Sequence, residues 1–136
     1  GLPLHNGLLN YFDHASNAFI SAYRRHKEGH QDDFDIVVEY LASPNIQDKV
    51  LLLADPMLAT GQSLVSVFEV LHQQGLPKEI HIVSVIASEE GIDYVKKHFP
   101  DTTKLWVATV DSTLNAKGYI VPGLGDAGDL AYGDKL

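Results

Sequence analysis

Asp55-Pro56-Met57-Leu58-Ala59-Thr60-Gly61-Gln62-Ser63 joins two stretches of different character. Before it, residues 49–54 form a short apolar run bounded by polar residues, which is typical of a buried strand. After it, leucine, valine and phenylalanine recur at positions 64, 67, 68 and 71, the spacing of one face of a helix. The sequence therefore predicts a strand, a turn of small residues and the start of a helix.

A turn of this composition has two chemical interpretations. In the first it binds a phosphate, because the N–H groups of a first helical turn point outward and the helix dipole favours negative charge there. Thr60 and Ser63 would add hydroxyl donors, Gly61 would permit close approach, and Asp55 would face the ligand from the strand end. In the second, Asp-Pro is an ordinary turn and the following residues only cap the helix. The residues alone leave both open.

The same stretch excludes one common phosphate loop. The spacing G-x-x-x-x-G-K-[ST] of a Walker A motif and its lysine are both absent. A nucleoside-triphosphate hydrolase is therefore disfavoured.

The rest of the chain alternates between strand and helix patterns. A short helix is predicted within residues 1–14, and two strands at 17–23 and 34–41 flank the polar run 24–33, which suggests an antiparallel hairpin or flap with a long charged tip. Further elements are a helix from Leu64 to near Gly75, a strand at 79–87, a helix at 89–98 and a strand at 104–110.

This order predicts an α/β fold. Strands that alternate with helices form right-handed crossovers and a parallel sheet. We expect a doubly wound, Rossmann-like parallel sheet flanked by helices, with the antiparallel hairpin flap added near the start. Residues 111–136 are rich in glycine, too much so for regular structure, and are expected to form an ordered binding loop or a flexible end.

Composition narrows the classes of function. The 136 residues fit one domain, and 45% hydrophobic with 21% charged residues is ordinary for a globular protein. The net charge of −8 argues against partners such as nucleic acid or an acidic membrane. The absence of cysteine excludes disulfide and thiolate chemistry and fits the cytoplasm. The seven histidines lack any ligand spacing, so no transition metal bound by the protein is expected.

Two segments resemble signature motifs of the uracil phosphoribosyltransferases, a type I phosphoribosyltransferase family. Asp55–Ser63 is similar to the family's loop for phosphoribosyl pyrophosphate (PRPP), whose usual form DPMLATGGS has glycine in place of Gln62. Gly118–Asp129, with the sequence GYIVPGLGDAGD, is similar to its uracil-binding segment. The resemblance implies transfer of the phosphoribosyl group from PRPP to uracil, giving UMP and diphosphate in pyrimidine salvage. It also implies Mg²⁺ held through PRPP and water rather than by a protein site.

The resemblance assigns roles to individual residues. PRPP would be bound by Arg24, Asp55, Pro56, Met57, Leu58, Ala59, Thr60, Gly61, Gln62, Ser63 and Asp126. Uracil would be bound by Ile120, Gly125, Asp126 and Ala127, with Asp126 also catalytic.

The arginine assignment depends on register. Arg24 is preferred over Arg25 because Tyr23-Arg24 matches a tyrosine-arginine pair of the family. A solvated turn is the alternative interpretation of both arginines.

The resemblance also concerns the whole protein. It implies that residues 1–136 are a single phosphoribosyltransferase domain, the C-terminal part of a longer enzyme whose preceding portion carries a further PRPP-contacting arginine. Members of the family form dimers or larger homo-oligomers, and some respond to GTP.

Two other functions remain open from the sequence. Gln62 and the missing arginine suggest a non-catalytic module that senses PRPP or nucleotide. A phosphoribosyltransferase for another base, such as a purine or orotate, is the second alternative. If position 62 has a positive φ, Gln62 costs about 1 kcal/mol or more; its amide also offers an additional donor.

Overall fold

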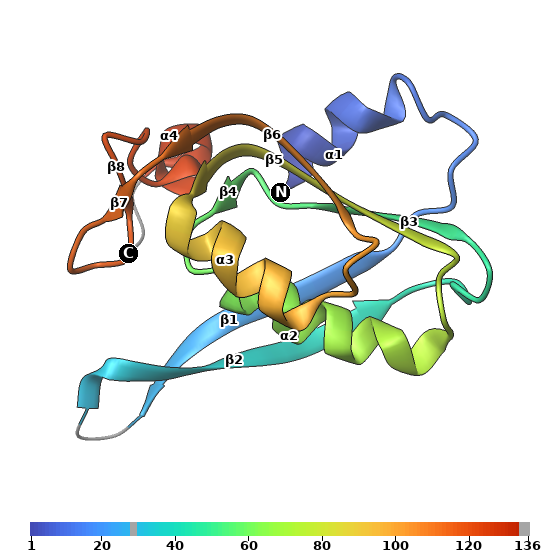
Figure 1. The fold of residues 1–136 in the computed structure, drawn as a ribbon, viewed down its shortest axis with the longest axis horizontal. Coiled ribbons are helices and arrows are strands. Elements are labelled where there is room, and N and C mark those ends of the chain that lie inside the picture. The colour runs from blue at the N-terminus through green and yellow to red at the C-terminus, as the bar shows by residue number, and fades with distance from the viewer. Residues whose placement is uncertain (28–29, 134–136) are drawn as a thin grey trace.

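A computed structural model of the protein describes residues 1–27 and 30–133. For residues 22–27, 30–36 and 38 it describes the backbone but not the side chains. Figure 1 shows the elements in order. They are α1 (Leu2–Leu9), β1 (Phe19–Lys27), β2 (His30–Ala42), β3 (Val50–Ala54), β4 (Met57–Leu58), α2 (Gln62–Leu71), a 3₁₀ turn (His72–Gln74), β5 (Glu79–Ser88), α3 (Glu89–His98), β6 (Lys104–Asp111), β7 (Thr113–Leu114), β8 (Ile120–Val121) and α4 (Ala127–Tyr132).

The centre of the fold is a parallel sheet built around β5. β3 and then β4 pair with one side of β5, and β6 pairs with the other, all in parallel. The α2 and α3 crossovers connect these strands in the order strand, helix, strand, helix, strand. The predicted α/β class with a parallel sheet flanked by helices and an antiparallel hairpin is confirmed.

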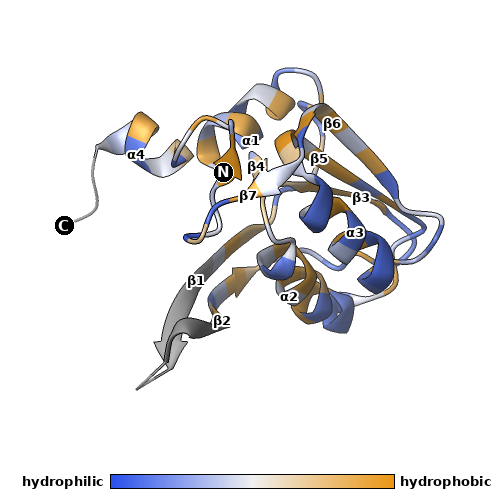
Figure 2. Ribbon diagram, turned by 60° about the vertical axis from the view of Figure 1, so that its left-hand side comes forward, coloured by the Kyte–Doolittle hydropathy of each residue, from blue (hydrophilic) through white to orange (hydrophobic). Residues whose placement is uncertain are grey.

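The hydrophobic core lies between the sheet and α2. Leu64, Val65, Phe68 and Leu71 of α2 are buried, and they belong to one cluster with Leu53, Ile80 and Ile82 of the sheet and with Val95 and Phe99 at α3. The rings of Phe68 and Phe99 stack at 4.4 Å between centroids. Figure 2 shows α2 and α3 on the same side of the sheet. This packing fixes where α2 begins, close to the carboxyl end of β3.

The opposite face of the sheet is more open. Side chains that alternate with the core residues on β3 and β6 remain exposed there, with Val50, Leu52 and Trp106 at 52%, 36% and 56%. α1 lies on this side in Figures 1 and 2, but none of its residues is buried. The helical layer on this face is therefore thinner than the doubly wound arrangement expected from the sequence.

The hairpin is longer than the sequence predicts. β1 and β2 pair from Phe19 with Ala42 to Lys27 with His30, so the polar run predicted as a charged tip is mostly strand. A hydrogen-bonded ladder needs only backbone groups, and polar side chains do not prevent it when both strands are paired. The short helix predicted within residues 1–14 is confirmed as α1, which ends at Leu9.

The glycine-rich segment contains regular structure, contrary to expectation. β7 and β8 form an antiparallel pair with Thr113 opposite Val121, and α4 follows. The loop between the strands is organised by Asn115, whose side-chain oxygen accepts hydrogen bonds from the N–H groups of Lys117 and Tyr119. Glycines supply the positive φ values that the connecting turns require, as at Gly123 (54°) and Gly125 (79°). Among residues 1–27 and 30–133, no helix has the length and apolar character needed to cross a membrane.

A cluster of polar side chains spans β5 and β6 on the open face. The Lys104 ammonium lies 3.0 Å from the Glu79 carboxylate, and the His81 ring lies 3.5 Å from the same oxygen. Trp106 donates its indole N–H to Nδ1 of His81 at 3.0 Å, which leaves Nε2 of the neutral ring to face Glu79. The hydrogen bond from Lys104, then that from His81, and the charge of Lys104 lower the pKa of Glu79.

This cluster predicts a pH-dependent contribution to stability. A carboxylate whose folded pKa is lowered stabilises the fold above its unfolded pKa, and that contribution is lost as the pH falls through the folded pKa. Glu79→Gln is therefore expected to lower the unfolding midpoint at pH 7, and the difference from wild type should close in acid, below the model-peptide pKa of Glu. Urea unfolding at a series of pH values measures this.

The control is Glu69→Gln, an exposed glutamate of α2 that makes no ion pair within the described part of the chain. A difference between Glu79→Gln and wild type that persists unchanged into acid would contradict the assignment.

Candidate functional site

The loop that leads to α2 stays attached to the sheet longer than predicted. Asp55 donates its N–H to the carbonyl of Val83 at 3.0 Å, and the Pro56 carbonyl accepts from the N–H groups of Val85 and Ile86 at 3.2 Å. Pairing then resumes at β4, with Met57 opposite Ile86. The strand predicted to end at residue 54 therefore continues to 58 after an interruption at Asp55-Pro56, and the true turn is only Ala59–Gly61.

Buried groups anchor the base of this turn. Leu58 is 1% exposed as a whole residue, so it belongs to the core. The N–H of Leu58 donates to the hydroxyl of Ser84 at 3.2 Å, and that hydroxyl donates to the carbonyl of Ile86 at 2.9 Å. Ser84 is 4% exposed, and these bonds satisfy its hydroxyl inside the sheet.

The turn ends in a left-handed glycine that caps α2. Gly61 has φ 77° and ψ −12°. The first hydrogen bond of the helix runs from the N–H of Val65 to the carbonyl of Gly61 at 3.1 Å. The N–H groups of Ser63 and Leu64 therefore have no partner within the helix, as at the start of any α-helix. This is the geometry that favours an anion.

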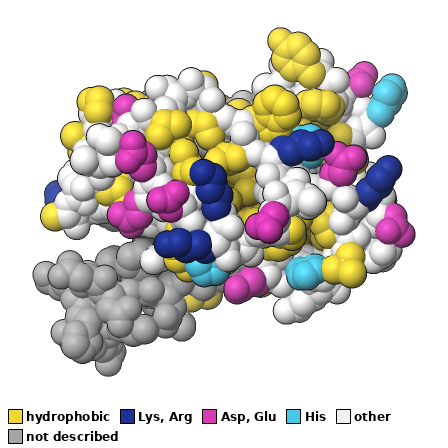
Figure 3. All heavy atoms as spheres, in the orientation of Figure 1, with side chains coloured by type: hydrophobic (Ala, Val, Ile, Leu, Met, Phe, Trp, Pro, Cys, Tyr) yellow, Lys and Arg dark blue, Asp and Glu magenta, His cyan; other side chains and the backbone are white. Residues whose placement is uncertain are grey.

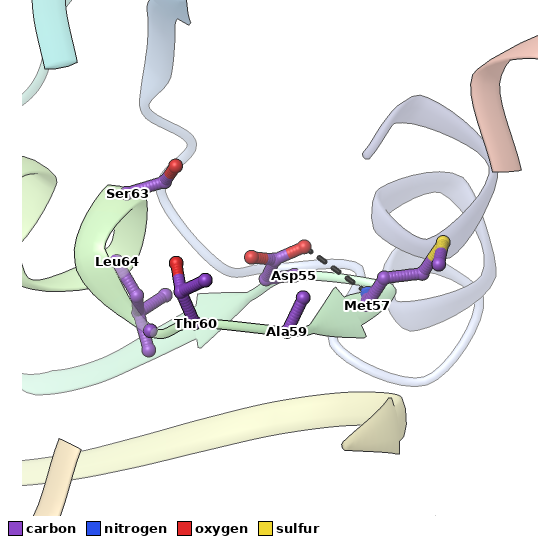
Figure 4. A pocket seen from close by; sticks show the side chains of 7 residues that line it. Asp55, Met57, Ala59, Thr60, Ser63 and Leu64 are labelled. Atoms are coloured by element: carbon purple, nitrogen blue, oxygen red, sulfur yellow. Dashed lines mark hydrogen bonds between the residues drawn. The ribbon is translucent and has the colours of Figure 1, made fainter. Parts of the chain in front are cut away.

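These groups surround a small pocket. It is lined by Asp55, Met57, Ala59, Thr60, Gly61, Ser63 and Leu64. Figure 4 shows the Asp55 carboxylate and the hydroxyls of Thr60 and Ser63 bordering the same space, with the first turn of α2 at its edge. One oxygen of Asp55 accepts the N–H of Met57 at 3.1 Å, which orients the carboxylate. Six of the nine residues of the predicted loop thus line one pocket, and Pro56, Leu58 and Gln62 do not.

Gln62 does not carry the strain that the sequence raised as a concern. It is the first residue of α2, and among the described residues other than glycine only Asp48 has a positive φ. The residue with the left-handed conformation is Gly61, and this position is glycine both in this chain and in the family's usual motif. The condition under which Gln62 would cost about 1 kcal/mol is therefore not met.

The second predicted segment lies at the same end of the sheet. Figure 1 places β7, β8 and α4 at the end of the molecule where β5 and β6 finish. Asp126 is the N-cap of α4, and its Oδ1 accepts the N–H groups of Gly128 at 2.7 Å and Asp129 at 3.1 Å. Ala127 is the first residue of that helix, and Gly125 precedes the cap with open space where a side chain would lie.

Ile120 has a different position from the other residues predicted to bind uracil. The whole residue is 2% exposed, and its backbone pairs with that of Leu114, so Ile120 is buried within the segment. Gly123 beside it is required sterically, since a Cβ there would lie 2.0 Å from the carbonyl oxygen of Ile120.

Sequence reasoning missed Asp111. Its carboxylate accepts the N–H of Gly123 at 2.9 Å and so ties the glycine-rich segment to the end of β6. A signal was present, because Asp111 follows the strand predicted at 104–110, as Asp55 follows its own strand. Arg24 lies in β1 opposite Ile36, but its side chain is outside the described part of the structure, so its predicted role is not tested.

Charge is distributed without a broad basic area on the face that Figure 3 shows. Acidic and basic side chains of the described residues are interspersed there. Among the residues whose side chains are described, no three His, Asp or Glu side chains gather in a way that could hold a metal ion. Backbone N–H groups at the start of α2 supply positive potential at the pocket.

A parallel sheet whose strand leads through a glycine turn into an exposed helix start defines a class of protein that binds phosphate-bearing ligands. Comparison with known proteins identifies the family. A family model for uracil phosphoribosyltransferase matches residues 1–134. The chain belongs to the uracil phosphoribosyltransferase family.

Individual relatives agree with this assignment. A curated uracil phosphoribosyltransferase of Porphyromonas gingivalis is 56% identical over 136 residues, which are all of this chain and 62% of that protein. One from Thermococcus gammatolerans is 43% identical over 99% of this chain and 58% of its own length. A solved structure of a protein from Aquifex aeolicus superposes with a TM-score of 0.84 at 30% identity, covering 97% of this chain and 60% of that one. The chain thus spans less than two thirds of these proteins.

The cap geometry yields a paired stability prediction. Gly61→Ala is expected to destabilise the fold by about 1–2 kcal/mol, the cost of a left-handed non-glycine residue, and a Cβ would also lie 3.0 Å from the Gly91 carbonyl oxygen. Gln62→Gly, which restores the usual family residue, should also destabilise, by roughly 0.5–1 kcal/mol, because it adds backbone freedom to a helix. Urea unfolding measures both. A more stable Gln62→Gly protein would show that Gln62 is strained after all.

Proposed function

We propose that the protein to which this chain belongs transfers the phosphoribosyl group of PRPP to N1 of uracil, giving UMP and diphosphate. The observation that carries the proposal is the pocket at Asp55–Ser63, where a helix start, two hydroxyls and an oriented carboxylate surround one space. The family assignment supports the choice of substrates.

In this proposal the loop binds the 5′-phosphate of PRPP. The N–H groups at the start of α2 and the hydroxyls of Thr60 and Ser63 donate to its oxygens. Asp55, held by the N–H of Met57, accepts hydrogen bonds from ribose hydroxyls. These contacts position the sugar, and positioning is the main contribution a protein makes to a displacement of this kind.

The reaction replaces one bond at the anomeric carbon by another. The bond from C1 to the diphosphate oxygen breaks, the bond to N1 of uracil forms, and the N1 proton of uracil passes to the departing diphosphate or to water. An oxocarbenium-like transition state is expected, by analogy with glycoside hydrolysis. A carboxylate close to the sugar stabilises that positive charge, and Asp126 is the residue proposed for this region.

Uracil would be read by the segment that leads into α4. Uracil offers two carbonyl acceptors and one N–H donor, and backbone groups can match that pattern where the chain is irregular. The backbone of Ile120, Gly125 and Ala127 is proposed for this role, with the positive φ of Gly125 holding the chain irregular. The buried side chain of Ile120 serves the fold.

The metal, the assembly and the remaining contacts are part of the proposal. Mg²⁺ is proposed to arrive with PRPP and to neutralise the diphosphate while bound mainly by substrate oxygens and water. Asp126 would support it through water and Arg24 would contact the diphosphate. Homo-oligomer formation, regulation by GTP and a cytoplasmic location are proposed on the family resemblance alone.

Product analysis tests the reaction. The full-length protein with Mg²⁺, PRPP and uracil is expected to make UMP and diphosphate in equal amounts, and to prefer uracil over orotate, adenine and hypoxanthine in competition. Chromatography of the products measures both. Binding of UMP without any turnover would favour the sensing module, and no preference for uracil would favour an enzyme for another base.

Asp126→Asn tests the proposed catalytic residue cleanly. Asparagine caps helices as well as aspartate does, so α4 should keep its N-cap and the thermal midpoint should not change. Loss of the charge should lower kcat/KM by about 10²-fold or more, the lower end of the effect of removing one electrostatic contact to a transition state. Steady-state kinetics measure this.

The matched control is Asp101→Asn, which removes an exposed acid from the turn between α3 and β6. Wild-type kinetics in Asp126→Asn would remove this residue from the site.

A further inference from the structure

Ser88 joins the start of α3 to the loop that forms the pocket. It is the N-cap of α3 and is 0% exposed. Its hydroxyl accepts the N–H of Gly91 at 2.8 Å and donates to the carbonyl of Ala59 at 2.5 Å. The first of these bonds is ordinary helix capping. The second is not needed for capping, and it reaches a residue that lines the pocket.

Gly91 shows how closely α3 approaches the same carbonyl. A Cβ at this position would lie 2.3 Å from the carbonyl oxygen of Ala59 and 2.8 Å from that of Leu58. Any side chain here would push the loop backbone away. Two residues after Ala59, a Cβ at Gly61 would lie 3.0 Å from the Gly91 carbonyl oxygen. The turn of the pocket is therefore seated directly on the first turn of α3.

The pinned carbonyl sets the direction of the next donor. The Ala59–Thr60 peptide is trans, as are all described peptides except Val121–Pro122. In a planar trans peptide the C=O and N–H groups point in opposite directions. Because the Ala59 carbonyl is held toward Ser88 and α3, the N–H of Thr60 must point away from α3.

We propose that Ser88 is a positioning residue for the phosphate pocket: its hydroxyl holds the Ala59 carbonyl so that the Thr60 N–H is presented to the 5′-phosphate. This rests on the proposed function, since it assumes that the pocket takes a phosphorylated ribose. Ser88 touches no substrate and acts only through the orientation of one peptide plane. A donor that is fixed before binding avoids the entropic cost of ordering it in the complex.

Two substitutions separate this role from capping. Ser88→Ala and Ser88→Gly both remove the hydroxyl and its two hydrogen bonds. Glycine still caps a helix nearly as well as serine, whereas alanine does not. If Ser88 positions the donor, both variants should bind ribose 5-phosphate about tenfold more weakly than wild type, the loss expected for one hydrogen bond to a charged group. If it only caps α3, Ser88→Gly should bind like wild type. Lys96→Ala, on the exposed side of α3, is the control and should not change binding.

The test uses full-length protein and reads binding and turnover separately. Calorimetry gives the Kd for ribose 5-phosphate, and steady-state kinetics give KM for PRPP and for uracil. The expected result is a raised Kd and a raised KM for PRPP in both Ser88 variants, with KM for uracil unchanged.

Each outcome decides one claim or both. UMP synthesis by wild type with unchanged Kd in Ser88→Gly would overturn the positioning role alone. Weaker sugar-phosphate binding in both variants without UMP synthesis by wild type would overturn the proposed reaction alone. Wild-type protein that neither binds ribose 5-phosphate nor makes UMP would overturn both.

Discussion

The left-handed backbone of Gly61, held against α3, is the constraint on which the site depends. It turns the chain from β4 into α2 within three residues and leaves the first N–H groups of α2 facing the pocket. A side chain at this position would be strained by its φ of 77° and would also meet Gly91, Tyr94 and Val95 of α3. Glycine is therefore required for two reasons: another residue would be strained at this φ, and its Cβ would crowd α3. The start of α2 and the contact of this turn with α3 both depend on Gly61.

Buried hydroxyl groups hold this turn to the sheet. Ser84 bonds the N–H of Leu58, and Ser88 bonds the carbonyl of Ala59, so successive residues of the loop are fixed from β5 and from its end. A buried polar group costs free energy unless it is hydrogen-bonded. Both serines are almost fully buried, and their hydroxyls find partners mainly in the loop backbone and at the end of β5. The core thereby stabilises the loop in one conformation before any ligand binds.

Much of the fold was predictable because periodic apolar residues report which face of an element is buried. The pattern at 64, 67, 68 and 71 located α2, although its first turn begins at Gln62. The β-branched run at 79–87 located β5, although not its central place in the sheet. Other features were not predictable because they depend on contacts between distant residues. The strand character of residues 24–27 and 30–33 comes from pairing across the hairpin, and β4 exists only because Met57 and Leu58 pair with Ile86 and Ala87.

The candidate site was predictable to the same extent. The pocket motif could be found from its residue types. Ser88 and Gly91 act on the loop around Ala59, which lies 29 residues before Ser88, and nothing in their sequence context indicates that contact. The position of Asp111 after a strand was a signal, but its hydrogen bond to Gly123, 12 residues further on, could not be predicted.

The central claim is that the start of α2 and the turn before it form a prearranged binding site for the phosphate of a phosphorylated ribose. The most direct measurement is an NMR titration of the ¹⁵N-labelled protein with ribose 5-phosphate, following every backbone amide. The account predicts that the largest saturable shifts occur at Thr60, Gly61, Gln62, Ser63 and Leu64, with the helices otherwise unchanged. Saturable shifts confined to another region, or no saturable shift at these five amides, would contradict it.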